Sequence, residues 1–79
     1  MTDVDPADVW PEDAMDVEEA VVSNWFVRDG ASVDEGETVA EIQIEKVSVD
    51  VPAPASGTLD VLVGESEEFR RGDPIARIE

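Results

Sequence analysis

The chain has 79 residues, with 21 Asp and Glu against 5 Lys and Arg, so its formal net charge is −16. This length allows one small domain. The absence of Cys and His excludes disulfides, thiolate nucleophiles, zinc–thiolate sites and any site built on imidazole. So acidic a chain repels phosphates and anionic lipid, and we expect no nucleic acid and no membrane among its partners.

Three explanations compete for the acidity. Dense carboxylates keep a protein hydrated at high salt, where screening limits their repulsion to a few Å. The chain could instead be an acidic mimic of nucleic acid, or its charge could prevent folding. The acids are spread along the chain and apolar alternation survives between them, which favours adaptation to salt. The lack of Cys and of an N-terminal apolar stretch favours the cytoplasm of a high-salt organism.

Residues 1–7 are expected to form an acidic flexible tail, and residues 8–79 a single all-β domain. Residues 12–20 allow a short helical turn. Beyond them, β-prone stretches are separated by turn residues, and several stretches alternate apolar and polar residues with a period of two. No metal site is predicted. The β-prone stretches are 20–22, 25–27, 39–44, 47–51, 59–63 and 75–78.

The chain resembles itself at an offset of 36 residues. The segment 35–42 (EGETVAEI) aligns with 71–78 (RGDPIARI), sharing the Gly, the Ala and the final Ile. The same offset matches Trp25 with Val61 and Val33 with Phe69. Two similar half-domains predict an all-β sandwich or barrel with quasi-twofold symmetry, in which neither half can bury its apolar face alone.

The register of a hairpin places Lys46, the only lysine, at its tip. With Glu45 and Lys46 as a two-residue loop, apolar pairs fall on one face and polar pairs on the other, whereas a slip of one residue mixes them. Two-residue loops favour Gly or Asn, so local turn chemistry does not explain a Glu-Lys loop. The predicted pairs are Ile44–Val47, Gln43–Ser48, Ile42–Val49, Glu41–Asp50 and Ala40–Val51.

Lys46 has an ordinary explanation, because a lysine at a turn is usually solvated and has no further role. Retention of one lysine among 21 acids, at this tip, favours a functional one. An ammonium group beside Glu45 stays charged, so Lys46 is a poor unaided nucleophile and does not suit Schiff-base chemistry. It can be an accessible amine for another enzyme to acylate.

These residues resemble the biotinyl/lipoyl attachment family, and specifically its lipoyl domains. The similarity runs from about Val9 to Ile78 and centres on residues 42–57 (IQIEKVSVDVPAPASG). The resemblance implies a flattened β-barrel, or sandwich, of two four-stranded antiparallel sheets. It also implies lipoic acid linked through an amide to Lys46, with Glu45 and Val47 as hairpin recognition residues.

The resemblance implies a non-catalytic carrier, a swinging arm that shuttles acyl groups within a 2-oxoacid dehydrogenase complex. The implied partners are a lipoate ligase or lipoyl transferase, a thiamine-diphosphate 2-oxoacid dehydrogenase, an acyltransferase core and a flavin dihydrolipoamide dehydrogenase. The isolated domain is expected to be monomeric. The acids Glu41, Glu45 and Asp50 could steer docking onto basic surfaces, although solvation at high salt explains them as well.

The sequence departs from the family pattern at several positions. Lipoyl domains usually have Asp where this chain has Glu45, and commonly Ala where it has Val47. Biotin carriers usually flank their lysine with Met on both sides, so a biotin carboxyl carrier is disfavoured. Ser66 falls where the repeat would place a second Gly30. An unmodified acidic β-barrel that binds partners also fits the pattern, as does the carrier of glycine cleavage, although that protein is usually longer.

Overall fold

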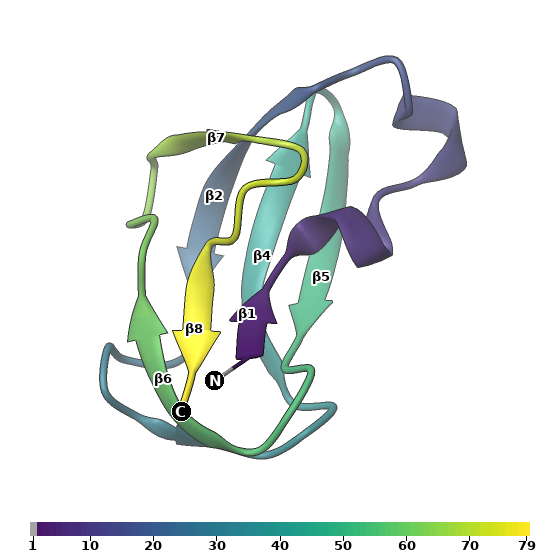
Figure 1. Cartoon of the computed structure of the whole chain (residues 1–79). Coiled ribbons are helices and arrows are strands. Elements are labelled where there is room, and N and C mark those ends of the chain that lie inside the picture. Colours follow the sequence, from purple (N-terminus) through teal and green to yellow (C-terminus); the bar gives the residue numbers. More distant parts are fainter. Residues whose placement is uncertain (1) are drawn as a thin grey trace.

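A computed structural model describes residues 2–79, and eight strands and two 3-10 helices make up the fold (Figure 1). The strands are short because turn residues interrupt each apolar alternation. The elements are β1 (Thr2–Val4), η1 (Pro6–Val9), η2 (Glu12–Ala14), β2 (Glu19–Trp25), β3 (Ser32–Val33), β4 (Thr38–Ile44), β5 (Val47–Pro52), β6 (Gly57–Val61), β7 (Glu68–Arg70) and β8 (Ala76–Ile78).

Two four-stranded sheets face each other, with strand orders β1-β8-β6-β3 and β5-β4-β2-β7, and the pairings are antiparallel. Each sheet takes strands from both halves of the chain: β7 pairs with β2, and β3 pairs with β6. The predicted fold is therefore confirmed, and neither half of the chain completes a sheet alone.

The 36-residue repeat appears as equivalent hydrogen bonds. Phe26 N–H donates to the Val39 carbonyl, and Leu62 N–H to that of Ile75, both at 2.9 Å. The turn at 28–31 is closed by a bond from residue 31 to residue 28 (3.0 Å), and the turn at 64–67 by the equivalent bond (3.1 Å). The two halves therefore share their turns as well as their strands, as quasi-twofold symmetry requires.

The core lies between the sheets and is apolar, because alternate residues of each strand point inward. No polar or charged side chain of the described residues is buried. The largest fully buried side chains are those of Ile42, Ile44, Leu59, Ile75, Val4, Val22, Val39, Val51 and Pro6.

The expectation of a flexible tail over residues 1–7 is wrong for residues 2–7. Thr2–Val4 forms strand β1, which pairs with β8, and Val4 is only 1% exposed. The first 3-10 helix follows directly, with the Asp5 carboxylate accepting a hydrogen bond from Ala7 N–H (2.9 Å) as its N-cap. Burial of one valine and pairing of three residues fix this segment, so the domain begins before residue 8. Met1 lies outside the described residues.

The expected short helical turn within 12–20 is present as η2 (Glu12–Ala14). Across the described residues, no helix is long and apolar enough to span a membrane. The two ends of the described chain lie side by side, since Thr2 pairs with Ile78, and Figure 1 shows them at the opposite end of the barrel from the β4–β5 hairpin.

Candidate functional site

The β4–β5 hairpin has the predicted register, from Ile44–Val47 to Ala40–Val51, so Glu45 and Lys46 form its two-residue loop. Both loop residues are exposed. Lys46 is the second of the two, with its side chain at the tip of the hairpin and its backbone held by the ladder behind it. The exposed amine that the alternation predicts is therefore presented by a rigid element.

Glu45 resolves the poor turn chemistry by taking a left-handed backbone conformation, with φ of 53°. Such a conformation costs a residue other than Gly about 1–2 kcal/mol. The Gln43 amide offsets part of this cost, because its Nε2 donates to the Glu45 carbonyl oxygen at 3.1 Å. Backbone strain retained beside the one lysine is typical of functional loops.

Val47 follows Lys46 on the face that turns toward the core, yet its side chain is 41% exposed. Along the same face, Val49 is half-buried and Val51 is 2% exposed. The apolar side chains on this face of β5 therefore continue past the core to the tip of the hairpin. The result is an apolar contact point next to Lys46, which suits the predicted recognition role of Val47.

The three predicted docking acids are only partly brought together. Glu45 adjoins Lys46, whereas Glu41 and Asp50 pair across the hairpin four residues from the loop, about 14 Å along the strand. Glu41 is half-buried and accepts a hydrogen bond from the Ser23 hydroxyl at 3.2 Å. The structure therefore gives Glu41 a local partner, while Glu45 and Asp50 remain exposed.

A hollow of about 250 Å³ lies beside the hairpin, on the outer face of the sheet β5-β4-β2-β7. The sequence did not reveal this hollow. Its walls come from β2, β4 and β7, which are adjacent in the sheet but far apart in the chain. The carboxylates of three of its residues make it acidic. It is lined by Glu19, Ala20, Val21, Gln43, Glu45 and Glu68.

Trp10 is a second residue whose role the sequence did not reveal. It is 7% exposed, its Nε1 donates to the Ala14 carbonyl at 2.9 Å, and its ring meets Phe69 edge-on with centroids 6.3 Å apart. The guanidinium of Arg71 also donates to the Met15 carbonyl. These contacts anchor the long segment between β1 and β2.

The acids of residues 2–79 do not form a group of three suited to a metal ion.

Comparison with known proteins agrees with this geometry. The sequence model of the family described as "Biotin-requiring enzyme", the biotin/lipoyl family, matches residues 10–78. The chain belongs to the biotin/lipoyl attachment family. The predicted resemblance is therefore confirmed.

Relatives of this family member are acyltransferase components. The chain is 39% identical over 71 residues to the dihydrolipoyllysine-residue acetyltransferase component of the acetoin cleaving system of Bacillus subtilis, covering 89% of this chain and 18% of that protein. It is 34% identical over 70 residues to the corresponding pyruvate dehydrogenase component of Staphylococcus epidermidis, covering 87% and 16%. The chain thus spans less than a fifth of the length of these curated relatives.

The fold matches that of a solved lipoyl domain, from the 2-oxoglutarate dehydrogenase complex of Azotobacter vinelandii. The TM-score is 0.75 at 22% identity, covering 100% of this chain and 96% of that one. At this identity the likeness concerns the fold. It agrees with the two four-stranded sheets of this chain.

Proposed function

We propose that the chain is a swinging-arm carrier domain whose Lys46 holds lipoic acid through an amide bond. The observation that supports this most is the position of Lys46, the only lysine of the chain, at the exposed tip of the strained β4–β5 loop. The amide forms when the Lys46 nitrogen, after losing a proton, attacks an activated lipoyl carboxyl group and displaces its leaving group. When bound, lipoic acid supplies a dithiolane that accepts an acyl group and passes it on.

The chain's own residues contribute presentation. Lys46 and the attached arm extend from a rigid hairpin at the end of the barrel opposite the chain ends (Figure 1). A tether of this kind raises the effective concentration of the carried group at each active site within its reach. The domain needs no catalytic side chain for this task, since the cofactor supplies the chemistry.

The partners follow from the same proposal. A lipoate ligase or lipoyl transferase modifies Lys46, and a thiamine-diphosphate 2-oxoacid dehydrogenase, an acyltransferase core and a dihydrolipoamide dehydrogenase use the arm. The names of the relatives favour a complex of this class. Glu45 and Val47 flank the lysine, where biotin carriers usually have Met, and this disfavours biotin.

Intact-mass measurement tests the proposal. The protein is incubated at high KCl with a lipoate ligase, lipoate and ATP, and separately with a biotin ligase, biotin and ATP. We expect one lipoyl group per chain and no biotin. The matched variant Lys46→Arg keeps the charge and should stay unmodified. Because the chain has no other lysine, the assay has no competing site. A biotin adduct, or folded protein without any adduct, would refute the proposal.

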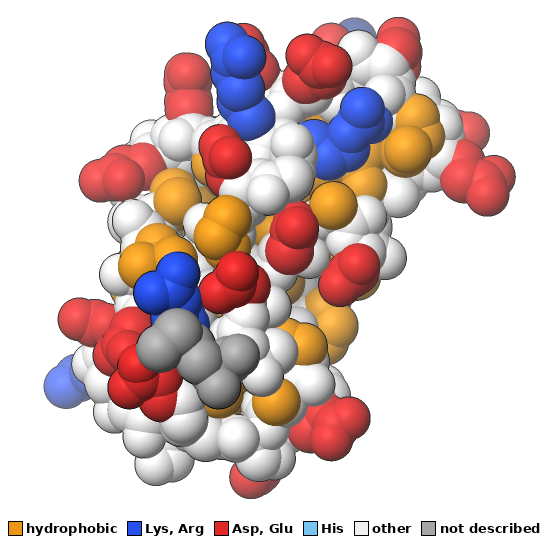
Figure 2. All heavy atoms as spheres, in the orientation of Figure 1, with side chains coloured by type: hydrophobic (Ala, Val, Ile, Leu, Met, Phe, Trp, Pro, Cys, Tyr) orange, Lys and Arg blue, Asp and Glu red, His pale blue; other side chains and the backbone are white. Residues whose placement is uncertain are grey.

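We also propose that the domain is adapted to the cytoplasm of a high-salt organism. Each Asp and Glu of the chain is exposed or half-buried. Two ion pairs occur among the described residues, Arg70–Glu19 at 3.9 Å and Arg77–Asp3 at 3.1 Å. On the face shown in Figure 2, acidic side chains are spread over the surface with few basic ones between them. Uncompensated charge of this density favours solvent of high ionic strength.

A further inference from the structure

Strand β5 forms one edge of its sheet, and it is longer than the other edge strands. It has 6 residues, against 3 in β1, 2 in β3 and 3 in β7. An edge strand presents backbone N–H and C=O groups that another strand can pair with, and proteins usually protect such edges. The three short edges offer little to pair with, so β5 differs from them.

The register of the hairpin shows which groups of β5 face outward. Ile44 and Val47 close the two-residue loop as a hydrogen-bonded pair, and hydrogen-bonded and non-hydrogen-bonded pairs then alternate. Ser48 and Asp50 belong to the second kind, so their N–H and C=O groups point away from β4. Within residues 2–79, neither residue has a backbone partner on that side.

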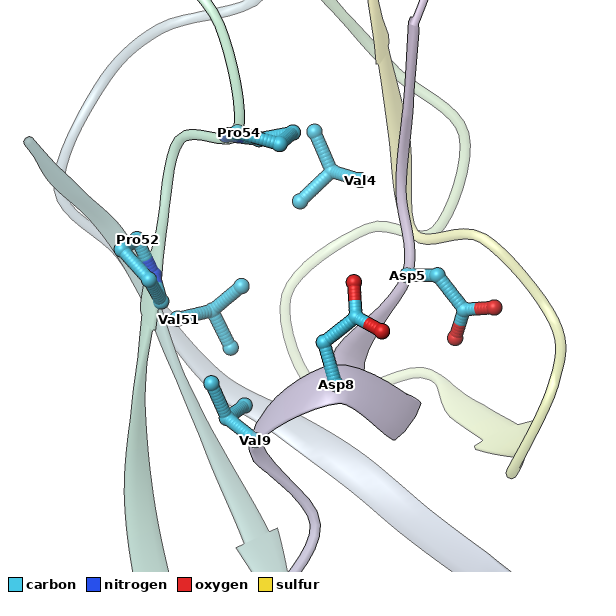
Figure 3. A pocket seen from close by; sticks show the side chains of 7 residues that line it. All are labelled: Val4, Asp5, Asp8, Val9, Val51, Pro52 and Pro54. Carbon is cyan, nitrogen blue, oxygen red and sulfur yellow. The ribbon is translucent and has the colours of Figure 1, made fainter. Parts of the chain in front are cut away.

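The far end of β5 is protected. Pro52 has no N–H, and the 3-10 helix η1 lies against the strand there. Figure 3 shows Val9 of η1 directed toward Val51, beside a hollow of about 220 Å³. Asp8 also points toward this hollow. The unprotected part of the edge is therefore the Val47–Asp50 stretch, which follows Lys46 directly.

We infer that the Val47–Asp50 edge is a docking site for an extended, basic strand of the enzyme that attaches the lipoyl group to Lys46. This inference rests on the proposed function of Lys46. The unpaired backbone groups specify a strand, since only an extended segment pairs with alternate residues. Charge complementarity specifies Lys or Arg on that strand, because two exposed acids adjoin it: Glu45 in the loop before the stretch and Asp50 at its end.

Strand addition also explains why the lysine must lie beside an open edge. An added strand lies about 4.8 Å from β5 and is fixed in register by its backbone hydrogen bonds. The loop holding Lys46 belongs to the same ladder, so the enzyme's active site is placed relative to the amine by backbone pairing. Backbone pairing then sets the register of the docked strand, while Val47 and the carboxylates of Glu45 and Asp50 contribute side-chain contacts.

A proline substitution tests the edge. Ser48→Pro removes an outward N–H and leaves the β4 ladder intact, as is usual for proline at a sheet edge. The matched control is Glu65→Pro, at the second position of the turn 64–67 beside β7, on the opposite edge of the sheet. Proline suits that position because Ser66 has a positive φ. We expect lipoylation by lipoate ligase to slow about tenfold in Ser48→Pro, and to be unchanged in Glu65→Pro.

Amide hydrogen exchange provides a second measurement that does not depend on the proline variant folding. Unmodifiable Lys46→Arg is mixed with the ligase, and exchange is followed by NMR. We expect the amides of Ser48 and Asp50 to be protected and that of Glu65 to be unaffected. Failure of the wild type to be lipoylated would refute the proposed function. If the wild type is lipoylated, two results would overturn the edge inference and leave the proposed function intact. One is a normal lipoylation rate in folded Ser48→Pro, and the other is a lack of protection of the Ser48 and Asp50 amides.

Discussion

Gly30 and Ser66 occupy equivalent turns of the two halves, and both have a positive φ, 86° and 70°. Their backbone N–H groups make equivalent contacts with the other half of the chain, Gly30 donating to the Leu59 carbonyl (2.6 Å) and Ser66 to that of Val22 (2.7 Å). Both acceptor residues are fully buried. The architecture therefore imposes the left-handed conformation at residue 66 although the residue there is not Gly.

Ser66→Gly should consequently stabilise the domain. It relieves a left-handed conformation that costs a residue with a Cβ about 1–2 kcal/mol, and it loses part of that gain to the entropy of Gly in the unfolded chain. We expect a net increase of about 0.5–1 kcal/mol in the free energy of unfolding, measured by urea denaturation at fixed high KCl. Ser32→Gly, within strand β3, is the matched control and should destabilise. An equal effect of the two substitutions would contradict the explanation.

The hairpin and its lysine could be predicted because side-chain alternation alone decides the register of β4 and β5. Strand β1 could not, since three residues with one buried Val4 are too few to show a period. The acidic hollow beside Glu45 could not be predicted either. Strands β2 and β7 come from different halves of the chain and become neighbours only in the folded sheet. Predicting the open edge at Ser48 and Asp50 would have required both the register of the hairpin and the order of the strands in the sheet.

Trp10 is the residue whose loss should most disturb the segment between β1 and β2. Trp10→Phe removes the Nε1 hydrogen bond to Ala14 and part of the edge-on contact with Phe69. The Ala14 carbonyl still accepts from Val17 N–H at 3.0 Å, so the variant loses one hydrogen bond, worth about 0.5–1.5 kcal/mol. Because the smaller ring also packs less against Phe69, we expect a loss of at least this size in thermal or urea unfolding. Phe26→Leu replaces an aromatic ring that is 51% exposed and should change stability by less than about 0.5 kcal/mol. Equal losses in the two variants would contradict the anchoring role of Trp10.

The uncompensated surface charge predicts that stability depends on salt. Lowering KCl from about 2 M to about 0.1 M lengthens the screening distance from a few Å to about 10 Å, so repulsion among the exposed acids should lower the melting temperature seen by circular dichroism. The triple variant Glu12→Gln, Asp16→Asn and Glu65→Gln removes three exposed charges and should reduce this dependence. If melting does not respond to KCl, the salt-adaptation proposal is wrong.

The position of the amine within the loop is itself testable by exchanging the two loop residues. The double variant Glu45→Lys with Lys46→Glu preserves composition and net charge, and it moves the lysine to the residue with φ of 53°. Successive residues of a tight loop project in different directions, so the amine then leaves the hairpin at a different angle to the β5 edge. A misplacement of about 1 Å can cost about 100-fold in rate, and we expect ligase-catalysed lipoylation, followed by intact mass, to fall at least tenfold. Circular dichroism of the variant should match the wild type, which separates misplacement of the amine from loss of the fold. Lipoylation of the exchanged variant at the wild-type rate would show that the enzyme recognises an exposed lysine near the tip and not its place in the ladder.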